Sequence, residues 1–259
     1  MTADAPEVSL VLPVYNGAAF AARSVRTAAE LLASRFPSWE VVVVDDGSLD
    51  GTAAAVGSVT CEGVRLVRLA TNTGKFGALK SGMREARGRC RAFTDADLPF
   101  DLSAIPYMAR LVNERGFHLV IGDRTLRESA YHDQVAPPRR LASRSFAFFV
   151  RLLVTGGLFD TQCGLKAFRA DVAEALFPLL LDDGFAGDVE LLYVALKYNL
   201  EIKRIPVRLV RSEPTTVRLL GHPGRMLASI ARLKGNWEAG RYLSADLATI
   251  ARQAYWNPP

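Results

Sequence analysis

Short runs of apolar residues alternate with longer stretches of mixed character through the first half of the chain. Five runs rich in valine, isoleucine and leucine have the length of β-strands, and they lie at residues 8–14, 39–46, 64–70, 90–97 and 117–123. The segments between them, such as residues 18–36 and 74–88, have the length and apolar spacing of helices. This alternation predicts an α/β fold, in which a mostly parallel sheet is flanked by helices.

Polar side chains gather where four of these runs end. They are Pro13, Tyr15 and Asn16 at the end of the first run, Asp45 and Asp46 at the end of the second, Asp95 and Asp97 at the end of the fourth, and Asp123 and Arg124 at the end of the fifth. In a sheet of this kind, ligands bind at the carboxyl ends of the strands. We therefore expect a phenol, carboxylates and a guanidinium to face one crevice.

The paired acids of residues 95–97 indicate the chemistry of that crevice. Asp95 and Asp97 can offer carboxylate oxygens to a hard cation such as Mg²⁺ or Mn²⁺, which keeps several waters and bridges to substrate phosphates. Such a metal ion neutralises a diphosphate leaving group. The alternative is that the acids only form a turn, as we expect Asp101 to cap the next helix. Asp45 and Asp46 at the neighbouring strand end make this alternative the weaker one.

Several common enzyme classes are excluded by motifs that the sequence lacks. It contains no GxGxxG after the first run, no GxxxxGK[ST] and no HExxH. None of its three histidines lies beside a nucleophile elbow. Cys61, Cys90 and Cys163 form no CxxC pair, which argues against a structural zinc site and a disulfide framework. We expect a reducing, cytoplasmic setting.

The chain of 259 residues has a net charge of +5, and the excess lies in its second half. Residues 1–130 contain 15 Lys and Arg against 15 Asp and Glu, whereas residues 131–259 contain 17 against 12. This asymmetry suits a phosphate-rich partner, either nucleic acid or an anionic membrane surface. An ordinary solvated basic surface is an equally good interpretation of the charge alone.

Two later segments each allow more than one interpretation. Residues 141–159 crowd aromatic and aliphatic side chains onto a helix, which suits a core helix, an interfacial helix or a dimer contact. Residues 211–259 predict a basic, amphipathic helical C-terminal extension that either lies on a membrane surface or packs against the domain, with packing as the default. No window of about 18 apolar residues exists, so we expect no membrane span.

The motifs at the strand ends resemble those of a known family. Five stretches over residues 8–125 resemble, in order, the motifs of family 2 glycosyltransferases of the GT-A fold: LVLPVYN, VVVVDDGSLDGT, NTGKFGALKSGM, FTDADLP and VIGDRT. Two later stretches, DTQCGLKAFR and GFAGDVELLYVALKYNLEIKRIPV, resemble the polyprenyl-phosphate sugar synthases, and among these the dolichyl-phosphate β-glucosyltransferases. The resemblance implies a Rossmann-like GT-A domain over residues 1–210, with a nucleotide-sugar half of about 1–125 and an acceptor half of about 126–210.

The resemblance also implies roles for individual residues. The residues expected to bind the nucleotide sugar are Pro13, Tyr15, Asn16, Val44, Asp45, Asp46, Lys75, Asp95, Ala96 and Asp97. Asp97 is the expected direct metal ligand, and Asp95 more nearly faces the nucleotide or sugar. Arg124 matches a basic residue near the diphosphate or the acceptor phosphate. The residues expected near the sugar and acceptor are Gln162, Lys166, Glu190 and Arg211.

Asp188 matches an acidic residue near the acceptor and has two interpretations. For an alcohol acceptor it would be the general base, whereas a phosphate acceptor is already anionic and needs little base. It also suits the N-cap of the helix that follows, and both roles can coexist. The sequence departs from the family pattern at Gly17, at Phe76 and after Arg211, where the lysine of a GSK element is missing and Arg218 is the other candidate cation.

Together these features predict an inverting, metal-dependent hexosyltransferase. It would move a hexose, with UDP-glucose as the expected donor, onto a polyprenyl or dolichyl phosphate at the cytosolic face of a membrane, as a peripheral protein. The first alternative keeps the donor and replaces the lipid by a soluble natural product or saccharide. The second is a non-catalytic protein that binds nucleic acid or an anionic surface, and we expect no nucleic-acid partner because the strand-end acids would repel phosphates.

Overall fold

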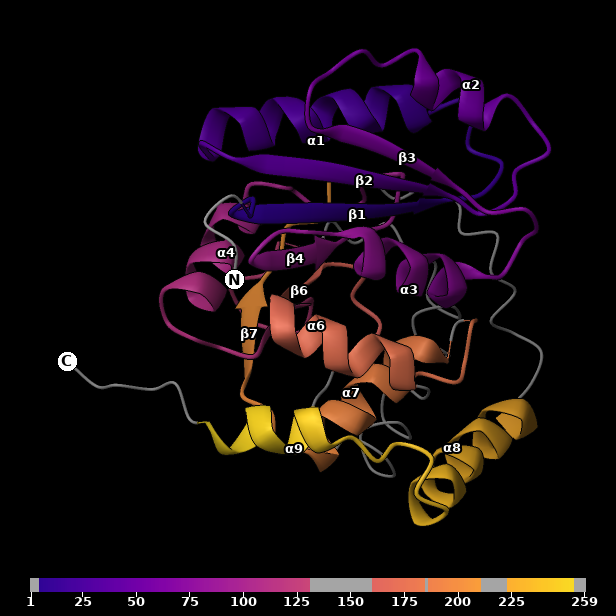
Figure 1. The fold of residues 1–259 in the computed structure, drawn as a ribbon, viewed down its shortest axis with the longest axis vertical. Coiled ribbons are helices and arrows are strands. Elements are labelled where there is room, and N and C mark those ends of the chain that lie inside the picture. Colours follow the sequence, from indigo (N-terminus) through magenta and orange to yellow (C-terminus); the bar gives the residue numbers. More distant parts are fainter. Residues whose placement is uncertain (1–4, 131–159, 185, 211–222, 254–259) are drawn as a thin grey trace.

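A mixed β-sheet forms the centre of the computed structural model, which describes residues 5–130, 160–184, 186–210 and 223–253 (Figure 1). Within these residues the sheet has seven strands in the order β3-β2-β1-β4-β6-β5-β7. The strands are β1 (Val8–Val14), β2 (Trp39–Asp45), β3 (Val64–Arg68), β4 (Cys90–Phe93), β5 (Leu119–Asp123), β6 (Lys166–Arg169) and β7 (Ile202–Pro206). The predicted α/β class and mostly parallel sheet are confirmed.

Strand β6 is the exception to the parallel arrangement. β1 lies parallel to both β2 and β4, and β5 lies parallel to β7, whereas β6 runs antiparallel between β4 and β5. Lys166 at the beginning of β6 is paired with Phe93 at the end of β4. The residues just before Lys166 therefore reach the same sheet edge as the carboxyl ends of the parallel strands.

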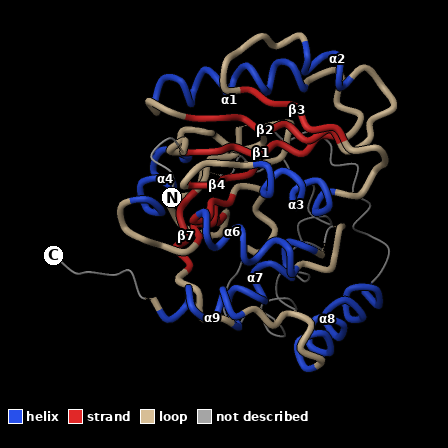
Figure 2. Tube along the Cα trace, in the orientation of Figure 1, coloured by secondary structure: helices blue, strands red, loops and turns tan. Residues whose placement is uncertain are grey.

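Helices cover both faces of the sheet, as the blue segments in Figure 2 show. Two hydrophobic clusters hold these layers together: the first includes buried residues of α1 and α4, and the second includes buried residues of α3, α6, α7 and α9. The helices are α1 (Ala21–Arg35), α2 (Thr52–Gly57), α3 (Lys75–Glu85), α4 (Ala104–Asn113), α6 (Ala170–Leu176), α7 (Gly187–Lys197), α8 (Pro223–Glu238) and α9 (Ala245–Arg252), with a 3₁₀ turn at Phe177–Leu179.

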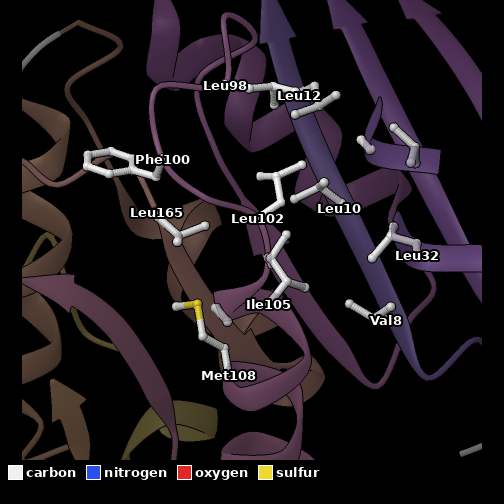
Figure 3. Close-up of a cluster of buried hydrophobic side chains, with 14 of the residues drawn as sticks. Val8, Leu10, Leu12, Leu32, Leu98, Phe100, Leu102, Ile105, Met108 and Leu165 are labelled. Carbon is white, nitrogen blue, oxygen red and sulfur yellow. The ribbon is translucent and has the colours of Figure 1, made fainter. Parts of the chain in front are cut away.

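The period-two pattern of β1 divides its side chains between the two clusters. Leu10 and Leu12 lie in the first cluster with Ile105 of α4, and Val11 lies in the second. Figure 3 shows Leu10, Leu12 and Ile105 in the first cluster. Each is fully buried, which stabilises the fold by about 1.5–3 kcal/mol per side chain. The prediction that Asp101 caps α4 is wrong, because the N-cap position belongs to Ser103; Oδ1 of Asp101 accepts the N–H of Ser103 at 2.9 Å in the turn before the helix.

The C-terminal helices pack against the domain. Leu247 and Ile250 of α9 lie in the second cluster, as do Leu233 of α8 and Tyr242 between the two helices. The ring of Tyr242 stacks on Trp237, with their centroids 6.4 Å apart. The default interpretation of the C-terminal segment, packing against the domain, therefore holds for the part that the structure describes. The alternatives for residues 141–159 lie outside the described residues. None of the described helices is long and apolar enough to cross a bilayer.

Candidate active site

The turn after β4 places the two predicted metal-binding acids at the sheet edge. β4 ends at Phe93, and the N–H of Leu98 closes the turn by donating to the carbonyl of Asp95 at 3.0 Å. Ala96 and Leu98 are buried in the first cluster and hold the turn against the core. Leu98 has a φ of +51°, an uncommon conformation for a branched residue that functional sites often contain. Asp95 and Asp97 are left partly exposed.

Lys75, the first residue of α3, contacts two carboxylates from different parts of the chain. Its Nζ lies 2.6 Å from Oδ1 of Asp95 and 3.7 Å from Oδ2 of Asp188. Burial alone would lower the pKa of Lys75, but the charges of Asp188 and Asp95 outweigh burial and raise this pKa above its usual value. Lys75 is therefore a cation at any pH at which the protein works.

Lys166 holds the other oxygen of Asp188. The side chain of Lys166 is fully buried, and its Nζ donates to Oδ1 of Asp188 at 2.5 Å and to the carbonyl of Cys163 at 2.7 Å. Asp188 lies in the first turn of α7, where the helix dipole favours a negative charge. The N-cap position belongs to Ala186, so the N-cap interpretation of Asp188 is wrong. Its carboxylate turns toward the two lysines instead.

A glycine makes room for Asp95. A Cβ on Gly164 would lie 2.2 Å from Oδ2 of Asp95, a distance that no real contact allows. Gly164 precedes β6, and the antiparallel course of that strand brings the glycine to the turn after β4. The carboxylate of Asp95 is thus enclosed between Gly164 and Lys75.

Asp45 and Asp46 each accept backbone hydrogen bonds from a loop at this edge of the sheet. Asp46 accepts the N–H of Thr73 at 2.7 Å and the N–H of Gly74 at 2.9 Å, which fixes the loop that leads into α3. Asp45 accepts the N–H of Ser48 at 3.0 Å. Both aspartates are buried. Asp46 therefore positions the segment that carries Lys75, a role that the sequence analysis did not assign to it.

The other predicted donor-site residues lie at the ends of β1 and β2. Tyr15 is 47% exposed, so its ring is available for stacking. Asn16, with a φ of +49°, accepts the N–H of Leu49 at 3.0 Å and so ties the turn after β1 to the loop after β2. Pro13 is partly buried in β1, and Val44 lies in the second cluster.

Arg124 is locked by an aspartate that the sequence analysis missed. Nε and one terminal nitrogen of Arg124 each donate to the carboxylate of Asp160 at 2.7 Å, and the backbone N–H of Arg124 donates to it at 2.8 Å. Burial would raise the pKa of Asp160, but the hydrogen bonds and charge of Arg124 outweigh it and lower that pKa. Asp160 begins the DTQCG stretch, and its place beside Arg124 depends on the antiparallel strand.

The remaining predicted residues are Gln162, Glu190, Arg211 and Arg218. Gln162 is partly buried in the loop before β6. Glu190 faces the C-terminal segment: it accepts the hydroxyl of Tyr242 at 2.5 Å and the N–H groups of Leu181 and Asp182 at 3.0 and 2.8 Å. It therefore links the loop after the 3₁₀ turn to the segment between α8 and α9 and is not part of the Asp95–Lys75 contacts. Arg211 and Arg218 lie outside the described residues.

Two departures from the family pattern have structural reasons. Phe76 is fully buried and packs on Gly187, where a Cβ would lie 2.3 Å from the phenyl ring. The larger residue at position 76 is thus matched by a glycine at the start of α7. A Cβ on Gly17 would lie 2.6 Å from Val14 and 2.8 Å from Phe20, so the turn after β1 has no room for a side chain.

The acids of the turn suit a cation that is completed by substrate. Within the described residues, no group of three or more His, Cys, Asp and Glu side chains forms a ready cage for a metal ion. Asp95 and Asp97 nevertheless supply the oxygen donors that Mg²⁺ and Mn²⁺ prefer, and such ions often take one or two carboxylates with water and substrate phosphates. The residues present therefore fit a divalent cation.

Comparison with proteins of known sequence gives the family. The model of the family described as "Glycosyl transferase family 2" matches residues 9–177. The chain is 29% identical over 246 residues to dolichyl-phosphate beta-glucosyltransferase of Dictyostelium discoideum, covering 90% of this chain and 75% of the relative. It is 32% identical over 219 residues to the enzyme of the same name from Drosophila melanogaster, covering 78% and 66%. It spans only 33% of glycosyltransferase AglD of Haloferax volcanii, at 32% identity over 80% of this chain.

Comparison with solved structures gives the same fold. Glucosyl-3-phosphoglycerate synthase from Mycobacterium tuberculosis, in complex with Mn²⁺, UDP and phosphoglyceric acid, superposes with a TM-score of 0.67 at 20% sequence identity, covering 89% of this chain and 79% of that one. At this identity the likeness supports the GT-A fold alone. With the family model matching most of the chain, the conclusion is that this protein belongs to glycosyl transferase family 2 and is a glycosyltransferase.

Proposed function

We propose that the protein transfers glucose from UDP-glucose to a polyprenyl phosphate, with inversion at the anomeric carbon and with the help of a divalent cation. The observation that carries this proposal is the meeting of Asp95, Lys75 and Asp188 beside Asp97 at the carboxyl edge of the sheet. The names of the relatives support the choice of sugar and acceptor, because the Dictyostelium and Drosophila proteins are dolichyl-phosphate beta-glucosyltransferases.

The donor's parts fit different strand ends. The uridine lies near Tyr15, Asn16 and the loop after β2, and the diphosphate lies over the turn that holds Asp97. Asp97 binds the cation directly, and a bound Mg²⁺ or Mn²⁺ supplies Lewis-acid stabilisation of the charge on the leaving diphosphate. Lys75 and Arg124 add positive charge beside it. Arg124 is held in place for this role by its two-pronged bond to Asp160.

The transfer is a single displacement. A phosphate oxygen of the acceptor attacks the anomeric carbon of glucose from the face opposite the nucleotide, and the bond between that carbon and the β-phosphate oxygen breaks. UDP leaves with the electron pair of that bond. The acceptor oxygen is already anionic near neutral pH, so no base has to remove a proton. Asp188, whose two oxygens face Lys166 and Lys75, has the geometry of a positioning residue in this reaction.

The test is an assay with labelled UDP-glucose, Mn²⁺ or Mg²⁺, and a polyprenyl phosphate in detergent. We expect a labelled glycolipid from the wild-type protein and a loss of about 100-fold or more for Asp97→Ala. Asp246→Ala, which removes an exposed aspartate of α9, is the matched control. Formation of the glycolipid at an undiminished rate without divalent cation, or an active Asp97→Ala protein, would contradict the metal-dependent mechanism.

A soluble phosphorylated acceptor is the second candidate. It is favoured by the structural likeness to the synthase that was solved with phosphoglyceric acid, a small acceptor whose phosphate could occupy a similar position. The same assay separates the two when the lipid is replaced by a small phosphorylated acid. A glucosylated soluble product with no glycolipid would support the second candidate and contradict the lipid acceptor.

A further inference from the structure

Lys75 forms an ion pair with Asp95, which lies next to Asp97, the proposed cation ligand. Its Nζ is 2.6 Å from Oδ1 of Asp95, and Asp95 belongs to the same short turn as Asp97. A second positive charge close to this ammonium would be repelled, and the repulsion is strong where little water screens it. A divalent cation that approaches the turn without a substrate therefore meets a cation that is already in place.

A second carboxylate allows Lys75 to leave Asp95 at small cost. Oδ2 of Asp188 is 3.7 Å from the same Nζ, and the side chain of Asp188 is only 4% exposed. A movement of about 1 Å would bring the ammonium from the first carboxylate into a direct bond with the second. Lys75 thus keeps a negative partner throughout, which avoids the penalty of an uncompensated charge in a poorly solvated site.

The charges around Lys75 are balanced before any ligand arrives. Asp95 and Asp188 carry two negative charges, and Lys75 and Lys166 carry two positive charges in the same chain of contacts. Asp97 supplies one further negative charge, so a divalent cation bound there alone would leave an excess of positive charge beside Lys75. The donor's diphosphate brings negative charge that compensates the cation. The cation therefore binds more favourably together with the diphosphate than alone.

We propose that Lys75 makes cation binding conditional on the nucleotide sugar. In the donor-free enzyme its ammonium holds Asp95 in the place of the cation, and when the diphosphate and cation arrive together it turns toward Asp188 and the diphosphate. The inference rests on the proposed function, because it uses the placement of the cation at Asp97. Its consequence is that removal of a positively charged residue should strengthen metal binding in the absence of nucleotide.

The experiment measures Mn²⁺ binding directly on the full chain, by the electron paramagnetic resonance signal of free Mn²⁺, with and without saturating UDP. We expect wild-type protein to bind Mn²⁺ weakly alone and tightly with UDP. Lys75→Met should bind Mn²⁺ alone about tenfold more tightly than wild type, and the improvement caused by UDP should shrink. Lys75→Gln, which loses the charge but keeps a polar end, should behave in the same way.

Two variants serve as controls. Lys75→Arg keeps the charge, and Lys80→Met removes another α3 lysine, which pairs with Asp183 and not with Asp95 or Asp188; both should retain wild-type Mn²⁺ affinity without UDP. Asp97→Ala added to Lys75→Met should abolish the gain. If both charge-removing variants bind Mn²⁺ alone no more tightly than wild type, or if the gain survives Asp97→Ala, the inference is overturned. If wild type binds no Mn²⁺ even with UDP, the metal-dependent function itself fails.

Discussion

At the scale of single residues, the site depends on the absence of one side chain. Gly164 lies so close to Asp95 that an added methyl group would overlap Oδ2 of that carboxylate. We expect Gly164→Ala to displace Asp95 from Lys75 and to lower kcat/KM about tenfold or more, because small misplacements of catalytic groups are costly. Gly57→Ala, which meets nothing within 4 Å, is the control. An active Gly164→Ala enzyme would show that the position of Asp95 is not critical.

A second residue-scale prediction concerns the buried lysine. Lys166→Met leaves the carboxylate of Asp188 without its closest partner in a fully buried place. We expect a loss of about 3 kcal/mol in the free energy of unfolding, as for other broken buried ion pairs. Lys80→Met, whose ion pair lies at the surface, should cost less than about 1 kcal/mol. Urea denaturation of the wild-type protein and the two variants measures both losses. Equal losses would contradict the argument that burial makes the Lys166–Asp188 pair the more costly one to break.

At the scale of elements, we expect the attachment of α9 to depend on pH. Nδ1 of His118, just before β5, accepts the N–H of Glu201 at 2.9 Å, and Nε2 lies 3.3 Å from the carbonyl of Ile250 in α9. Burial and the nearby Arg169 lower the pKa of His118 from its usual 6.5. Because the folded state resists protonation, stability should be complete above pH 6.5 and should fall as the pH decreases below it.

The measurement is the free energy of unfolding in urea at about pH 7.5 and about pH 5.5. The slope that His118 contributes should approach about 1.4 kcal/mol per pH unit at most. His118→Gln keeps a hydrogen-bonding side chain that does not titrate, so its stability should vary less over the same range. Identical pH dependence in the two proteins would show that His118 does not control the attachment of this helix.

The strands also show which parts of the fold and the site could be predicted from the sequence and which could not. The five predicted strands are present, and β1 has the predicted bounds of residues 8–14, because alternating core contacts fix such long apolar runs. β6 was not predicted, since a charged residue at each end of its four residues leaves only Ala167 and Phe168 as an apolar signal. Its absence from the prediction explains why Gly164 and Asp160 were missed: both reach the site only because this strand returns antiparallel. The pairing of Lys166 with Asp188 has the same origin.

At the scale of the whole molecule, the basic side chains of the second half should draw the protein to anionic surfaces. Arg232, Lys234 and Arg241 are exposed around the end of α8, beside Leu243, which is 77% exposed. Figure 1 shows α8 at the opposite end of the molecule from α1. We expect sedimentation with vesicles that contain anionic lipid, decreasing as salt rises above about 0.1 M because the attraction is screened.

Two double variants with the same change of charge test which surface binds the vesicles. Arg232→Glu with Lys234→Glu should weaken vesicle binding, whereas Arg23→Glu with Arg26→Glu on α1 makes the same change of charge on exposed positions elsewhere and should leave most of the binding. Equal losses in the two double variants would mean that net charge alone is responsible. Binding that does not depend on salt would contradict an electrostatic attraction.

The antiparallel strand also has a consequence for how such enzymes can be altered. Asp123 ends β5 and Lys166 begins β6, and both residues are fixed by hydrogen-bonded neighbours in the sheet. The sheet therefore sets where the intervening stretch must leave and return, but not how long it must be. Chimeras in which relatives exchange only the part between Ala130 and Asp160 leave Arg124, Asp160 and Gly164 in place, so we expect them to keep the same donor.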